Sequence, residues 1–175
     1  MLRWIPLLFS LAACDGSLVH ITIDEEDTQV VEQGSFIEQF VSWAGFGDFL
    51  NMDLTVATEL QNQGVKPGDI RTAEMLTLSL ESVSGSDLSF LDEMKIFVEG
   101  PDLDRKLIAH ADAFTGETLV DFEVEPIDLT DYITSTSMSL ITEVNGHRPD
   151  QRTEVKAHFR IDVGVTPQGV LGAIP

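Results

Sequence analysis

The residue with the most distinctive chemistry in this sequence is Cys14, the only thiol among 175 residues. A lone cysteine forms neither an intramolecular disulfide nor a multi-cysteine zinc site. It ends a short segment in which one positive charge, Arg3, precedes an apolar run over residues 4–11. That run is too short to cross a bilayer, which takes about 20 residues, but it suits the apolar region of a signal peptide.

Three small or apolar residues, Leu11, Ala12 and Ala13, stand directly before Cys14. This Leu-Ala-Ala-Cys sequence resembles the lipobox of bacterial lipoproteins. The resemblance implies that type II signal peptidase recognises these residues, removes residues 1–13 and leaves a diacylglyceryl group on the Cys14 sulphur. Two or three acyl chains, such as palmitate, anchor a protein stably where one does not. The residues alone leave open an ordinary cleaved signal or a buried N-terminal segment.

No other set of residues forms a recognisable catalytic group. The histidines His20, His110, His147 and His158 are scattered, and no G-x-S-x-G sequence is present. The chain also lacks H-E-x-x-H and paired Cys/His metal motifs. We therefore expect no enzymatic activity and no cofactor beyond the covalent lipid, with a hydrolase lacking a known motif as the weaker alternative.

An acidic run formed by Asp24, Glu25, Glu26 and Asp27 offers the oxygen ligands that Ca²⁺ prefers. The EF-hand spacing D-x-D-x-D-G is absent. The run is a candidate for weak calcium binding, and its alternative is a solvated, charged turn between the first strands.

A second acidic set alternates along the stretch 118–125, where Asp121, Glu123 and Glu125 share one face of a predicted strand. Like charges with this spacing repel unless cations or bases lie opposite them. This face is a second candidate for weak calcium or for a basic partner. The formal net charge of the whole chain, -20, likewise excludes a nucleic-acid partner and favours basic partners.

Strict alternation of apolar and polar residues predicts β-strands in most of the chain. The longest example covers 153–165, and a second covers 74–82, where Leu76, Leu78 and Leu80 are expected on the buried face. Further strands are predicted at 20–23, 94–100, 106–111, 118–125 and 137–144.

Turns are predicted between these strands, at 84–87, 100–101, 115–116 and 145–146. Two helical turns capped by aspartate are predicted at 87–93 and 128–133. The pattern predicts an all-β fold, an antiparallel β-sandwich of about seven to eight strands with one or two short helical turns.

An aromatic segment over residues 36–50 includes Phe36, Phe40, Trp43 and Phe46. Its spacing fits an amphipathic helix or a strand and loop. These side chains either fill the core of the sandwich or line a site for an apolar ligand.

Four stretches, NQGVKPGDI, LTLSLES, DLSFLDEMKIFVEGPDL and KLIAH, resemble segments of an uncharacterised family of exported bacterial β-sandwich proteins. The sequence therefore predicts a tether at 14–19, one sandwich domain at 20–166 and a C-terminal tail at 167–175. We expect a non-enzymatic lipoprotein of the bacterial cell envelope, anchored to the inner or outer membrane, with an envelope protein as partner. A periplasmic carrier of an apolar ligand is the alternative.

Overall fold

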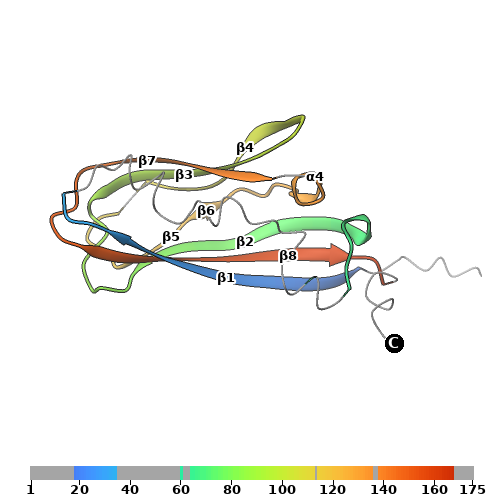
Figure 1. Ribbon diagram of the computed structural model, residues 1–175, viewed down its shortest axis with the longest axis horizontal. Coiled ribbons are helices and arrows are strands. Elements are labelled where there is room, and N and C mark those ends of the chain that lie inside the picture. The colour runs from blue at the N-terminus through green and yellow to red at the C-terminus, as the bar shows by residue number, and fades with distance from the viewer. Residues whose placement is uncertain (1–17, 35–59, 61–63, 113, 136–137, 168–175) are drawn as a thin grey trace, which may run out of the picture.

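Two antiparallel sheets pack face to face in this protein (Figure 1). The computed structural model describes residues 18–34, 60, 64–112, 114–135 and 138–167. The predicted all-β sandwich is confirmed. Its elements are β1 (Val19–Val31), the 3-10 turn η2 (Pro67–Asp69), β2 (Ile70–Ser82), β3 (Leu91–Gly100), β4 (Leu103–Ala111), β5 (Leu119–Asp121), β6 (Glu123–Val124), α4 (Thr130–Ile133), β7 (Ser139–Gly146) and β8 (Thr153–Val165).

The first sheet has the strand order β1-β8-β2-β5, and the second has the order β6-β4-β3-β7. The last strand, β8, lies between β1 and β2 and has the bounds that its alternation predicts. Its odd-numbered residues from Val155 to Val165 are buried between the sheets, because each points to the same face. Residues from both sheets join one hydrophobic core, which also contains Leu60 and Val65.

The predicted buried face of β2 is wrong at one position. Leu78 and Leu80 are buried as expected, but Leu76 is 44% exposed and Met75 is buried in its place. The register between β2 and β8 shifts between Met75 and Thr77, which marks a β-bulge. An extra residue in a strand reverses the alternation of faces before it.

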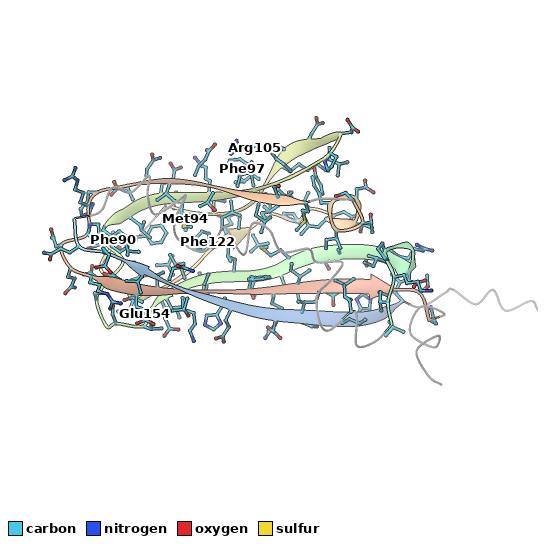
Figure 2. All side chains as sticks on the ribbon, in the orientation of Figure 1. Phe90, Met94, Phe97, Arg105, Phe122 and Glu154 are labelled. Carbon is cyan, nitrogen blue, oxygen red and sulfur yellow. The ribbon has the colours of Figure 1, made fainter. Side chains whose placement is uncertain are left out.

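The single strand predicted at 118–125 is also wrong. Its first part, β5, pairs with β2 in one sheet, and its second part, β6, pairs with β4 in the other. Phe122 lies between them, where its amide donates to the Leu78 carbonyl at 2.9 Å. Its ring packs edge-on against Phe114 with centroids 6.3 Å apart. The side chain of Phe122 points into the space between the two sheets (Figure 2).

The predicted turns at 84–87, 100–101 and 115–116 are confirmed. Gly85 and Gly116 have φ values of 78° and 74°, and Asp102 in the β3–β4 hairpin has a φ of 59°. The turn predicted at 145–146 is wrong, because β7 continues to Gly146 and pairs there with Leu91 of β3.

Of the two predicted helical turns, the one at 128–133 is present as α4, whereas the one predicted at 87–93 is wrong because β3 begins at Leu91. An aspartate accepts local hydrogen bonds at the start of both segments. Asp128 accepts hydrogen bonds from the Thr130 amide (2.9 Å) and hydroxyl (2.5 Å) at the start of α4. Asp87 accepts in the same way from Ser89. The segment after Asp87 is a turn that leads directly into β3, whereas the segment after Asp128 forms the single helical turn α4.

Candidate functional site

Two groups of predicted site residues lie outside the described residues. They are the predicted lipidation site Cys14 with Leu11, Ala12 and Ala13, and the aromatic residues Phe36, Phe40, Trp43 and Phe46. The two acidic sets lie within the described residues. They mark two separate candidate surfaces, one along β1 and one beside β4.

The acidic run Asp24–Asp27 lies in the middle of β1 and does not form the predicted turn. In register, Asp24 lies opposite Arg160 of β8 and Glu26 lies opposite His158. Arg160 donates through Nε to Asp24 Oδ1 at 2.7 Å. The run extends as a strand because β8 supplies a basic side chain across from each of these two carboxylates.

Glu26 contacts two residues of β8. Lys156 donates through Nζ to its Oε2 at 3.1 Å, and His158 Nδ1 lies 3.2 Å from its Oε1. His158 Nε2 also lies 3.9 Å from Glu81 Oε2 on β2, so this imidazole lies between carboxylates of both neighbouring strands. A basic row on β8 is thus flanked by acidic residues on either side.

The carboxylates of β1 remain accessible despite these contacts. The side chains of Asp24 and Glu26 are 62% and 56% exposed. Near the start of the strand His20 Nδ1 lies 2.6 Å from Asp162 Oδ2, which extends the row of contacts along the outer face. The carboxylates of β1 are therefore paired with basic side chains of β8 on one side of the strand. On its other side β1 pairs with no described strand. We call this surface, centred on Asp24 and Glu26, the β1 acidic edge.

A pocket of about 200 Å³ opens beside the end of β4, where the chain crosses from one sheet to the other. Three of its lining residues, Asp112, Asp121 and Glu123, are acidic, and the others are His110, Ala111 and Val120. His110 and Glu123 lie opposite each other in the β4–β6 register. We call this the His110 pocket.

His110 lies between two carboxylates of the crossover segment. Its Nε2 is 3.5 Å from Glu123 Oε2 and its Nδ1 is 3.8 Å from Glu125 Oε1. Nδ1 is buried without a hydrogen-bond partner among the described residues. Half of the described lining residues of the pocket are acidic, so the pocket suits a positively charged group.

The acidic sets do not assemble a metal site in the described part of the chain. No group of three or more histidine, cysteine, aspartate or glutamate side chains is arranged there to hold an ion. Asp24 and Glu26 instead bond to the basic residues of β8. Their geometry is that of cross-strand ion pairs.

The outer face of the second sheet carries a different kind of contact. The Arg105 guanidinium lies 3.8 Å from the centre of the Phe97 ring, a cation–π contact that Figure 2 shows at the top of the molecule. The same side chain donates through Nη2 to Glu143 Oε1 at 2.6 Å. Arg105 thereby links β4, β3 and the edge strand β7.

A polar cluster lies on the same face. Glu93 accepts hydrogen bonds from Lys95 and from Asn145 Nδ2, the latter at 2.8 Å, and these bonds hold the pKa of Glu93 below its usual value. The bond to Glu93 in turn raises the pKa of Lys95. These groups satisfy one another, so we assign them a role in pairing β3 with β7.

No protein-family model and no curated protein matches this chain. In the residues that the structure covers, no helix has the length and apolar character needed to cross a bilayer.

Sequence reasoning named Asp121, Glu123 and Glu125 but did not place His110 beside them. The missing information was the division of 118–125 between two sheets, since only that division brings β6 alongside β4. The signal that could have found His110 was the requirement, already clear from the sequence, that a base lie opposite these like charges.

Proposed function

We propose that this chain is a lipid-anchored protein of the bacterial cell envelope, and that its acidic β-sandwich binds a basic protein partner without catalysing a reaction. The observation that carries the proposal is the distance along the chain between the lipobox cysteine and the fold. β1 begins at Val19, five residues after Cys14. Five residues span at most about 18 Å when extended.

Such a short tether would hold one end of the sandwich close to the bilayer. The start of β1, the end of β8 and the start of β2 lie at this end, as the pairing of Val165 with both Val19 and Ile70 indicates. The turns at 83–90 and 147–152 lie at the opposite end (Figure 1). They, together with the sheet faces and edges, would be presented to a partner.

The charge of the surface supports a basic partner. The net charge of -20 would attract and orient positively charged proteins over distances of about 10 Å, the screening length at moderate ionic strength. Both acidic candidate surfaces already accommodate basic side chains of the chain itself, namely Arg160 and Lys156 on one and His110 on the other.

The test of the anchor is the intact mass of the full chain extracted from bacterial membranes. We expect a product that begins at Cys14 and is heavier by two or three acyl chains. Cys14→Ser should yield an unacylated protein that is not in the membrane pellet after a high-salt wash.

A matched control uses a nearby hydroxyl residue. The double variant Cys14→Ser, Ser17→Cys keeps one thiol in the same segment but moves it away from Ala13. It should behave like the single variant. Acylation of the displaced thiol, or membrane retention of Cys14→Ser, would contradict the proposal.

A further inference from the structure

We infer that β1 is a docking edge for an extended basic segment of a partner protein, which would add to the first sheet as a fifth strand beside β1. This inference deepens the proposed binding of a basic partner and rests on it. It names the surface and the form of the partner. Three features of β1 support this assignment: its position at the edge of the sheet, the regularity of its backbone and the charge on its outer face.

β1 is at the end of its sheet. Among the described residues it pairs with β8 alone, so it is an edge strand of the first sheet (Figure 1). In an antiparallel pair, alternate residues direct their amide and carbonyl groups away from the partner strand. Those groups are the ones that an added strand uses in β-augmentation.

The backbone of β1 is unusually regular for an edge. Its thirteen residues pair with β8 without a register shift over the whole described strand. The pairings of β2 with β8, β3 with β4 and β3 with β7 each contain a shift. A long edge without a bulge is a template for another strand, and charged side chains are one of the features that keep unrelated strands away from such an edge. On β1 the acidic run would therefore admit a strand of opposite charge and exclude others.

The charge of the edge selects the partner. Asp24 and Glu26 are more than half exposed, and their register partners on β8 are basic. A strand on the open side of β1 would face the same carboxylates that β8 faces. By the same cross-strand rule it should carry lysine or arginine at alternate positions.

The same charge disfavours a second copy of this chain. Two β1 strands paired antiparallel about their centres would bring the runs Asp24–Asp27 opposite each other. Directly opposed like charges are destabilising in a sheet. β7 (residues 139–146), an edge strand of the second sheet, is shorter than β1, and its register with β3 contains a shift.

The test uses the full chain and a synthetic peptide of about twelve residues that alternates lysine with threonine, long enough to cover β1. We expect saturable binding that weakens as salt is raised. Hydrogen exchange should show slower amides within 19–31 on peptide binding and no change within 139–146. A peptide of the same charge with alternate amides N-methylated should bind at least tenfold more weakly, since it lacks the donors for a strand ladder.

Two carboxylate variants check the charge. The double variant Asp24→Asn, Glu26→Gln should weaken peptide binding about tenfold, the product of two cross-strand pairs. Glu143→Gln on β7 is the matched control, because Glu143 is also 56% exposed and also bonds to a basic residue. It should leave binding unchanged. Melting curves show whether each variant is folded.

Other results would overturn the inference. Amides of β1 that are all protected in the free protein would mean that another part of the chain covers the edge. A dimer with a protected β1, found by light scattering without peptide, would identify a second copy as the occupant. If the N-methylated and unmethylated peptides bound equally well, charge attraction alone would explain the binding and no strand would be added to β1. None of these measurements involves Cys14, so they leave the proposed anchor intact.

Discussion

Gly146 and Phe90 approach so closely that a Cβ on residue 146 would lie 2.3 Å from the Phe90 carbonyl oxygen. That oxygen also accepts the amide of His147 at 2.8 Å, so it is held in place. This contact explains why Asn-Gly, a common turn pair, is found here at the end of a strand. A side chain at this position must displace backbone.

Gly146→Ala should therefore lower the free energy of unfolding by about 1–3 kcal/mol, the usual cost of forcing extra atoms into a filled space. Gly68→Ala is the control, because a Cβ at Gly68 would have no atom within 4 Å. Urea denaturation of both variants measures the difference. Equal stability of the two would show that the β3–β7 end adjusts without cost.

The bulge in β2 predicts opposite outcomes for two leucines. Leu78 is 2% exposed and Leu76 is 44% exposed. Leu78→Ala should cost about 2–5 kcal/mol of stability, whereas Leu76→Ala should change it by less than about 0.5 kcal/mol. Thermal melts of the two variants are sufficient. A large loss from Leu76→Ala would place that side chain in the core and remove the bulge.

The cap at Asp128 predicts a dependence of stability on pH. Hydrogen bonds from the Thr130 hydroxyl and amide lower the pKa of Asp128. A carboxylate with a lowered pKa in the folded state stabilises it above the unfolded value of about 3.9, and this contribution is lost as the pH falls through that value towards the folded one.

The measurement compares the Tm of wild type and Asp128→Asn at neutral pH and near pH 3. The amide keeps an acceptor oxygen but does not titrate. The wild type should be the more stable at neutral pH, and the difference should shrink towards zero in acid. Asp131→Asn, on the same helical turn, controls for a general change of charge. A difference that is constant with pH would argue against the cap.

The ion pair between Asp24 and Arg160 should contribute little to stability. Both side chains are at least half exposed, and such pairs contribute roughly 0.2–1 kcal/mol. A double-mutant cycle with Asp24→Asn and Arg160→Gln measures the coupling, which should fall further at high salt. Coupling above about 2 kcal/mol would mean that the contact is shielded from solvent.

The parts of the fold that alternation predicts are those in which one strand stays in one sheet. The segment 153–165 meets this condition, and its bounds are correct. The segment 118–125 does not, because side chains continue to alternate while the chain passes from β5 to β6. The prediction that Leu76 and Leu78 share the buried face is wrong for a related reason. A bulge changes the face to which a residue points without changing the residue types.

The sequence alone identifies the two acidic sets as candidate sites, but it does not identify the basic residues that lie beside them in the fold. The run from Asp24 to Asp27 by itself indicates a solvated, charged turn, because runs of charge usually face solvent. Its carboxylates gain their basic neighbours from β8, more than a hundred residues later in the chain. Local pattern cannot contain that information, since it depends on which strands become neighbours.

The position of β8 also determines the order in which the protein can form. β8, one of the two interior strands of the first sheet, is among the last segments to be made, and both β1 and β2 pair with it. Until residues 153–165 are available, β1 has no neighbour among the described strands. Contacts so distant along the chain give high contact order and slow folding. The first sheet can therefore close only after nearly the whole chain has been made, so its assembly is tied to the end of synthesis rather than to its start.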